Sequence, residues 1–342
     1  MKNSRIHLFG LLLAGLFVFV ACKTPKTDDK PAQEEKTYTI TKESLRKHIR
    51  FLASDKMKGR AAGTPEMKQA ADYIIGGFKA AGLMPVGTSF TQPFEITPCH
   101  SRSGDPEKVQ ADNIIGLLEG ADSLLKKEYI ILGAHYDHIG MARNTNAVCN
   151  GADDNASGVA LLLEVARKLN SVKDGLKRSI LFVAFDAEEQ GLLGSHHFVT
   201  HPVVPFDKIS LMMNFDMVGR IASGDSLAVS GGETFEGGTA LLNLFADTTS
   251  IHLYTTDRHV FASDHTPFFR NRIPIISLLP KLHPEYHTCK DDEHLINYDT
   301  MGSVCEYAFH VASMLANRDS IVPTIENLNQ GSDGTFIIFG RN

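Results

Sequence analysis

The chain has 342 residues, of which 43% are apolar and 22% charged, and this composition fits one large α/β domain or two small ones. Its formal net charge is -6, and no block of Lys and Arg interleaved with aromatic residues occurs. The sequence therefore gives no indication of a nucleic-acid partner.

The N-terminus has the form of an export signal. Lys2 and Arg5 precede an almost unbroken apolar stretch at 8–21, which is short for a helix that spans a bilayer. The stretch runs into Cys22 and resembles the lipobox of bacterial lipoproteins, although Phe19 stands where that motif usually has Leu. The resemblance implies lipid attachment at Cys22; an ordinary secretory signal or an uncleaved anchor helix are the alternatives.

Two helices are expected at the start of the folded sequence, which we place near Tyr38. Apolar residues recur at helical spacing after Thr41, a suitable cap. A second helix has Thr64 as its cap, Pro65 at its first position and Gly82 as its stop.

Strands and helices alternate in the remaining sequence. Short apolar runs predict strands, and longer amphipathic runs predict helices. The strands are expected at 113–118, 129–134, 179–185, 209–215 and 274–279, and the helices at 159–169, 192–199, 238–247 and 300–316. The short polar link between the first two strands suggests that they are antiparallel neighbours. The pattern predicts an α/β fold with a mixed, mostly parallel central sheet sandwiched between helices.

Side chains suited to metal follow several of these strands. The stretches that carry them hold His135, Asp137 and His138; Asp153 and Asp154; Glu188 and Glu189; Asp216; and Glu285 with His287. Each stretch alone has an ordinary explanation as a helix cap, a turn or a solvated charge. Ligands of open α/β sheets bind outside the carboxyl ends of strands, so the ordered series predicts one shared crevice.

These stretches resemble the co-catalytic zinc aminopeptidases, a family that also includes glutamate carboxypeptidases and glutaminyl cyclases. The similar motifs are at 133–138, 150–158, 186–195, 214–219, 263–268 and 285–288, and the segments at 51–55, 59–60 and 63–65 are similar to the part that precedes the catalytic core in exported members. The resemblance covers residues 40–318 and implies the zinc-dependent exopeptidase fold.

The resemblance implies two zinc ions per chain. Asp154 would bridge them, Glu189 and His287 would complete one site, and His135 and Asp216 would complete the other. Such a pair activates a bridging water and polarises a carbonyl group. Zinc accepts imidazole nitrogen and carboxylate oxygen, and a catalytic site leaves positions open.

Further roles follow from the same resemblance. Glu188 would be the general base, because a carboxylate that binds metal is a poor base while a free neighbour can move the proton. Asp137 would accept a hydrogen bond from the outer nitrogen of His135. Asp264 and His265 would line or brace the pocket; a role confined to packing their loop is the alternative.

Four cysteines remain after Cys22. Cys149 precedes the expected bridging Asp154 by five residues, and Cys289 follows His287 by two. If both neighbours meet at one metal pair, these cysteines are candidates for a disulfide; two independent buried thiols are the alternative.

The expected function is an exported zinc aminopeptidase acting on peptides with a free N-terminus. The alternatives are a glutaminyl cyclase-like enzyme, a carboxypeptidase of the same family, and a binding lipoprotein without metals. Cyclases of the family use pockets rich in tryptophan, and this chain has no Trp. A carboxypeptidase would need a basic pocket, for which Arg220, Arg258 and Arg270 are candidates.

The expected organisation is a signal peptide at 1–21, a lipid-anchored disordered tether at 22–37, a single zinc peptidase domain at 38–320 and a tail at 321–342. The chain would be a bacterial lipoprotein anchored in a lipid bilayer and facing the periplasm or the cell exterior.

Overall fold

The computed structural model describes residues 37–97, 108–142, 145–222, 225–246, 251–256, 263–279 and 282–324. All of them belong to one compact unit. The expected signal peptide, the lipid attachment at Cys22, the tether up to residue 36 and the tail beyond residue 324 lie outside the described residues.

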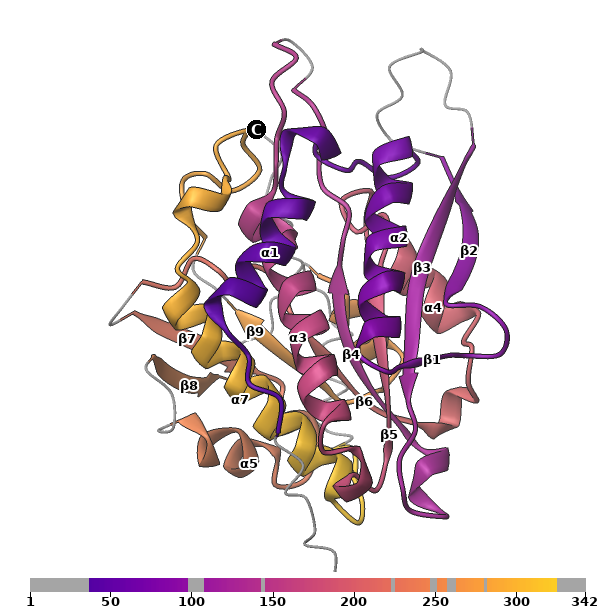
Figure 1. Ribbon diagram of the computed structural model, residues 1–342. Coiled ribbons are helices and arrows are strands. Elements are labelled where there is room, and N and C mark those ends of the chain that lie inside the picture. Colours follow the sequence, from indigo (N-terminus) through magenta and orange to yellow (C-terminus); the bar gives the residue numbers. More distant parts are fainter. Residues whose placement is uncertain are drawn as a thin grey trace, which may run out of the picture. The chain divides into compact units, whose positions relative to one another are not determined.

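Helices and strands alternate along most of the described chain (Figure 1). The helices are α1 (Lys42–Leu52), α2 (Pro65–Ala80), α3 (Gly158–Asn170), α4 (Leu193–Thr200), α5 (Gly238–Leu244), α6 (His265–Arg270) and α7 (Tyr298–Asn317). The strands are β1 (Met84–Pro85), β2 (Thr91–Ile96), β3 (Val109–Leu118), β4 (Tyr129–His135), β5 (Ser179–Phe185), β6 (Ile209–Asn214), β7 (Ser226–Ser230), β8 (His252–Thr256) and β9 (Ile275–Leu279).

The first two helices begin where their caps predict. The Thr41 side chain accepts a hydrogen bond from the backbone N–H of Ser44, and Thr64 does the same for Met67. Pro65 occupies the first position of α2, where its missing N–H costs no helical hydrogen bond. Both predicted starts are therefore confirmed.

The strands form one mixed sheet in the order β1-β3-β5-β4-β6-β9-β7-β8, with β2 paired to β3. The four central strands, β5, β4, β6 and β9, run parallel, while β3 and β7 join them antiparallel. The predicted mixed sheet with a parallel centre is confirmed.

The prediction that the strands at 113–118 and 129–134 are neighbours is wrong. Strand β5 lies between them and pairs antiparallel with β3 and parallel with β4. All seven side chains of β5 are buried, so this strand needs partners on both edges and takes the interior position. The short link between β3 and β4 passes the first residue of β5, Ser179, and does not form a hairpin.

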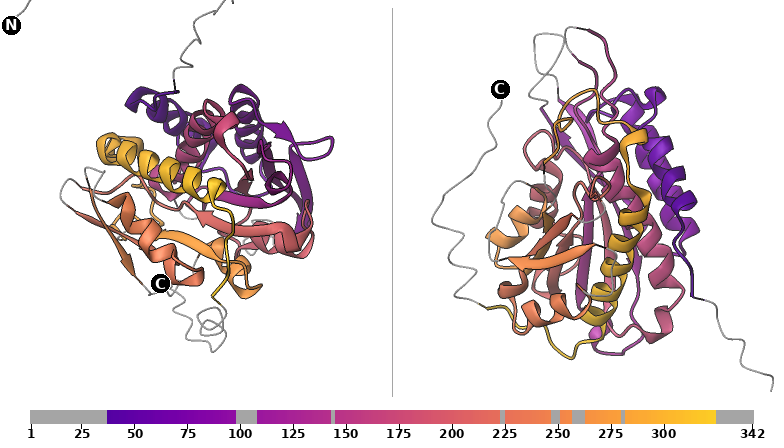
Figure 2. Two further views of the ribbon diagram at one scale, coloured as in Figure 1. Left: turned by 90° about the horizontal axis from the view of Figure 1, so that it is seen from below. Right: turned by 90° about the vertical axis from the view of Figure 1, so that its left-hand side faces the viewer.

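Helices cover both faces of the sheet (Figure 2). One face carries α1, α2, α3 and α7, which share a large apolar core with alternate residues of the strands. A second core lies on the other face, where Phe198 of α4 and Phe268 of α6 pack on Phe185 of β5. The sheet is thus a rigid layer whose strand ends can hold side chains in fixed positions.

The chain after α7 is joined to the loop before α5. The N–H of Glu236 donates to the carbonyl of Val322, and the N–H of Thr324 donates to Thr234. The first residues of the segment expected to be a tail are therefore hydrogen bonded to the folded unit.

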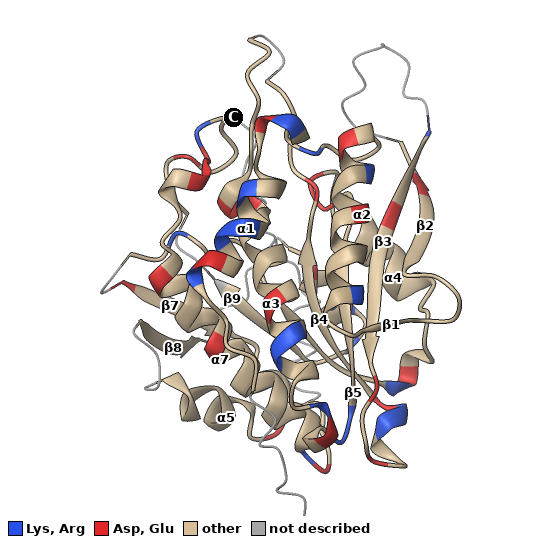
Figure 3. Ribbon diagram, viewed as in Figure 1, with Lys and Arg blue, Asp and Glu red and all other residues tan. Residues whose placement is uncertain are grey.

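The surface shows mixed charge. Lys and Arg are interspersed with Asp and Glu along α1, α2 and α3 in the view of Figure 3. No helix among the described residues is long and apolar enough to cross a membrane.

Candidate metal centre

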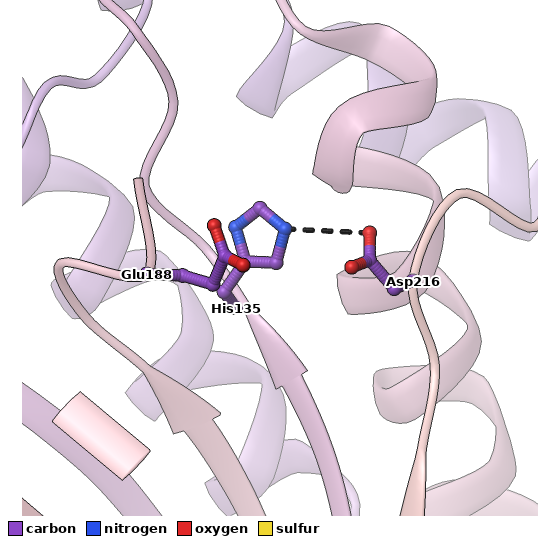
Figure 4. Close-up of side chains that lie close together, drawn as sticks. All are labelled: His135, Glu188 and Asp216. Carbon is purple, nitrogen blue, oxygen red and sulfur yellow. Dashed lines mark ion pairs between the residues drawn. The ribbon is translucent and has the colours of Figure 1, made fainter. Parts of the chain in front are cut away.

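The first cluster of metal-type side chains lies at the carboxyl ends of β4 and β6. His135 is the last residue of β4, and Asp216 follows β6 by two residues. The Nε2 atom of His135 is 3.4 Å from Oδ1 of Asp216 (Figure 4) and 3.3 Å from Oδ1 of Asp154. One imidazole and two carboxylates, which are ligands that zinc accepts, thus converge at one end of the sheet.

A second cluster uses the other oxygen of Asp154. The Nε2 atom of His287 is 3.2 Å from Oδ2 of Asp154 and 3.2 Å from Oε2 of Glu189. Asp154 therefore faces one imidazole with each of its two oxygens. The structure brings together all five residues expected as ligands, in the two groups that the resemblance implies.

The donor set fits zinc. In both clusters the imidazole nitrogen is 3.2–3.4 Å from each of the two carboxylate oxygens. Four-coordinate zinc with bonds of roughly 2.1 Å to nitrogen and oxygen separates its ligand atoms by about 3.4 Å. Each cluster offers three protein ligands, which is the number that leaves a position open for substrate or water.

Glu188 and Glu189 face different parts of this centre. A carboxylate oxygen of Glu188 lies within 4.8 Å of the ligand atoms of His135 and Asp216, and Figure 4 shows it beside the His135 ring. Glu189 instead groups with Asp154 and His138. The loop that carries both glutamates bends at Ala187, which has a φ of 57°. Geometry alone leaves Glu188 close enough to be either a base or a ligand.

Asp137 organises this loop. Its two carboxylate oxygens accept hydrogen bonds from the backbone N–H groups of Glu188 (3.0 Å) and Glu189 (3.1 Å). Its carboxylate is 3.5 Å from Nδ1 of His135, and its backbone carbonyl is closer, at 3.2 Å. Asp137 thus contacts the outer nitrogen of His135, as expected, and also anchors the two glutamates, which sequence reasoning missed.

The pKa values show how negative the centre is. Burial opposes protonation of His287, but its hydrogen bonds to Asp154 and Glu189 raise its pKa to about 10. Burial also opposes protonation of His135, and the charges of Glu188 and Asp216 nevertheless raise its pKa well above the usual value. The carboxylates therefore stabilise a positive charge placed between them, and a site for a dication requires such an environment.

The pKa values of the carboxylates of Glu188 and Glu189 shift in opposite directions. Burial would neutralise Glu189, but hydrogen bonds to His138 and His287 lower its pKa to about 2. Burial raises the pKa of Glu188 well above its usual value, with a further contribution from the charge of Glu189. The two adjacent glutamates thus differ in proton affinity because Glu189 is hydrogen bonded to two imidazoles, whereas the nearby charge of His135 does not offset the burial of Glu188.

Three further residues position the centre; sequence reasoning gave no role in it to Arg60 or Asp291, and named His138 only as a side chain suited to metal. Arg60 is fully buried and donates to the backbone carbonyls of five residues, namely Leu52, Tyr136, Asn150, Gly151 and Asp154. Asp291 accepts hydrogen bonds from the N–H groups of Asp153 and Asp154. His138 contacts Glu189. Residues 59–60 lie in a segment similar to the family, but nothing in that segment indicates a contact with the metal loops.

The remaining candidates lie beside the ligands. Asp264 and His265 are buried at the start of α6. Burial raises the pKa of Asp264 to about 7, although the nearby charge of His135 opposes this. Of the histidines close to His287 in sequence, His283 contacts Asp153 at 3.3 Å, and His294 is exposed.

Cys149 and Cys289 form a disulfide. It joins the loop that leads to Asp154 and the loop that follows His287. Cys305, the other cysteine among the described residues, is buried in α7. The cross-link ties together two loops that supply ligands to the second cluster.

Comparison with known proteins agrees with the family that the sequence motifs resemble. The profile of a family described as Peptidase family M28 matches residues 113–312. Aminopeptidase YwaD of Bacillus subtilis (strain 168) is 30% identical over 207 residues, which are 54% of this chain and 40% of that protein. The chain thus spans less than half the length of this relative.

Solved structures share the fold. BSAP, a zinc aminopeptidase from Bacillus subtilis, superposes with a TM-score of 0.66 at 19% identity, covering 80% of this chain and 95% of that one. A glutaminyl cyclase from Porphyromonas gingivalis gives a TM-score of 0.64 at 22% identity, covering 80% and 98%. At such identities the likeness concerns the fold, and it confirms the predicted architecture.

Proposed function

This chain belongs to peptidase family M28, and from that premise we propose that it is a zinc aminopeptidase with two zinc ions per chain. The observation that carries the proposal is Asp154, whose two oxygens each face a separate histidine-carboxylate pair. In this arrangement Asp154, His135 and Asp216 would hold one ion, and Asp154, Glu189 and His287 would hold the other. Zinc would supply Lewis acidity, which polarises a carbonyl and lowers the pKa of a nearby water.

Glu188 is the proposed general base. It lies beside His135 and Asp216 but is not needed to complete either set of three ligands. Its carboxylate would take a proton from the attacking water and pass it to the nitrogen of the leaving amine. Asp137 would keep it in place through the backbone N–H of Glu188, because a base must be held within hydrogen-bond reach of the proton that it removes.

A glutaminyl cyclase is the second candidate, favoured by the similarity in fold to the Porphyromonas gingivalis enzyme. Two features oppose it: the chain has no Trp for a cyclase-type pocket, and all five ligand positions of a metal pair are filled. A carboxypeptidase gains little support, because Arg220, a candidate for binding the substrate's carboxylate, already pairs with Glu285 at 3.1 Å.

We also propose that the protein is exported and lipid-anchored through Cys22. The support is the sequence at 2–22, with its basic start, apolar stretch and terminal cysteine. The substrates would then be peptides with a free N-terminus outside the cytoplasm.

A panel of matched peptides tests this function. We expect release of the first residue from peptides with a free amine, no release from the same peptides with an acetylated N-terminus, loss of activity on chelation and recovery with zinc. Cyclisation of N-terminal glutamine in place of hydrolysis would support the second candidate. Hydrolysis that survives complete chelation would refute a metallopeptidase.

A further inference from the structure

His138 is a buried histidine beside the second cluster, and it is not one of the proposed ligands. It follows Asp137 in the loop after β4 and is 1% exposed. Its Nδ1 atom is 3.0 Å from Oε1 of Glu189 and 3.7 Å from Oδ2 of Asp154. Among the described residues, its Nε2 atom is buried without a hydrogen-bond partner.

The two oxygens of Glu189 are divided between two histidines. Oε2 lies 3.2 Å from Nε2 of His287, on the side of Asp154, whereas Oε1 points to His138. A carboxylate that binds metal through one oxygen is fixed in orientation when its other oxygen accepts a hydrogen bond. His138 is placed to make that bond.

The chemistry of this contact indicates which atom carries the proton. A carboxylate has only acceptor oxygens, so a contact of 3.0 Å requires that Nδ1 of His138 donates. The distances separate His138 from His287: Nε2 of His287 is 3.2 Å from both Asp154 and Glu189, whereas Nδ1 of His138 is 3.0 Å from Glu189 and 3.7 Å from Asp154. His287 therefore lies between the two carboxylates, as a ligand would, and His138 lies against Glu189, where its Nδ1–H can donate to Oε1.

The ring of His138 is also held rigidly. Gly151 lies so close that a Cβ atom there would be 2.5 Å from the imidazole, and the backbone N–H of His138 donates to the carbonyl of Arg60 at 3.3 Å. His287, by contrast, has a side chain that is 42% exposed. In the second site His287 is thus an exposed ligand, while the buried His138 can fix the orientation of Glu189.

We infer that His138 is a positioning residue of the second metal site: it holds Oε1 of Glu189 so that Oε2 is presented beside His287 and Asp154. This inference rests on the proposed function, since it assigns a role toward the zinc ions of that function. It predicts that His138 sets the zinc affinity of the second site and leaves that of the first site unchanged.

The test compares three substitutions in the full chain by competition with a chromophoric chelator and by elemental analysis. His138→Ala should lose one zinc per chain at chelator concentrations at which the wild type keeps both, with an affinity reduced about 10- to 100-fold. His138→Asn places an amide N–H where Nδ1 lies and should restore most of that affinity. His138→Gln places its amide near the Nε2 position and should not.

The controls separate a metal effect from a loss of fold. His252→Ala, at an exposed histidine of β8, should bind zinc as the wild type does. Thermal unfolding of the zinc-free proteins should show that each variant folds, and saturating zinc should return the peptidase activity of His138→Ala toward the wild-type value.

Several results would overturn the inference. They are two tightly bound zinc ions in His138→Ala, equal weakening of both sites, or a His138→Asn variant as weak as His138→Ala, which would indicate a direct ligand. A wild type that binds no zinc would instead refute the proposed function. A wild type with two ions and an unaffected His138→Ala variant would refute this inference alone.

Discussion

Glu188 and Glu189 are adjacent in the chain but have different surroundings. The N–H groups of both are held by Asp137, while the carboxylate of Glu189 contacts the imidazoles of His138 and His287 and that of Glu188 lies beside the ring of His135. Hydrogen bonds to two imidazoles lower the pKa of Glu189, whereas burial raises the pKa of Glu188 in spite of the nearby charge of His135. The proposed division between a ligand and a base therefore arises from side-chain partners and not from position along the chain.

Arg60 is a buried arginine whose guanidinium donates hydrogen bonds to five backbone carbonyls. We expect Arg60→Lys to lower the free energy of unfolding of the zinc-free protein by about 2–4 kcal/mol, because a lysine cannot replace a fork that serves five carbonyls and each unmet buried group costs roughly 1–3 kcal/mol. Urea unfolding measures this value. Arg50→Lys, at an exposed arginine, is the matched control and should change little. Equal stability of the two variants would contradict this role.

At the scale of elements, the bounds of the helices can be predicted from the sequence more closely than the order of the strands in the sheet. Periodicity and caps predict α1 and α2 to within a residue or two, because local hydrogen bonds decide them. Strands β1, β2, β7 and β8 cannot be predicted in the same way, because they lie toward the edges of the sheet and their sequences contain no long apolar run. The position of β5 between β3 and β4 depends on long-range pairing that no local pattern encodes.

The same distinction applies to the centre. The five proposed ligands can be predicted because each lies near a strand end or in a motif of its own. His138, Asp291 and Arg60 act through contacts with residues about 50 to 140 positions away, as in the bond from Asp153 to Asp291. Spacing along the sequence gives no signal for such contacts.

Glu164 joins α3 to the N-terminal helix. Its carboxylate accepts hydrogen bonds from Tyr38, Ser44 and His48 (2.8, 2.5 and 3.0 Å). Burial opposes ionisation, but these bonds, that from His48 first, lower the pKa of Glu164 below its usual value of 4.5. A carboxyl with a lowered pKa in the folded state stabilises the protein above its unfolded pKa, and this contribution is lost as the pH falls through the folded value.

Glu164→Gln should therefore be less stable than the wild type by about 2 kcal/mol at pH 7, because hydrogen bonds to a charged group are replaced by neutral ones. The difference should shrink as the pH falls below 4.5. Urea unfolding of both zinc-free proteins at pH 7 and pH 4 provides the measurement. A difference that is independent of pH would show that the charge of Glu164 contributes nothing.

At the scale of the whole molecule, the parallel centre of the sheet brings the proposed ligands together. Residues from β4, from the loops after β5 and β6, and from the turn before α3 meet at one edge, because parallel strands end on the same side. The disulfide adds the loop of His287 to this group.

Substitution of Cys22 tests the anchor. We expect Cys22→Ala to shift the protein from the membrane fraction to the soluble exported fraction while its peptidase activity per molecule is unchanged, because the proposed anchor takes no part in the reaction. Fractionation followed by a peptide assay measures both. Cys305→Ala is a control for the loss of a thiol and should leave the location unchanged. An unaltered membrane fraction for Cys22→Ala would argue against lipidation.

The most direct test of the account is zinc content measured alongside hydrolysis in two adjacent variants. Glu188→Gln should keep two zinc ions per chain while hydrolysis falls about 100-fold or more, as loss of a general base implies. Glu189→Gln should lose one zinc ion. If Glu188→Gln loses zinc and Glu189→Gln keeps both ions, the proposed roles of the two glutamates are reversed and the account is wrong.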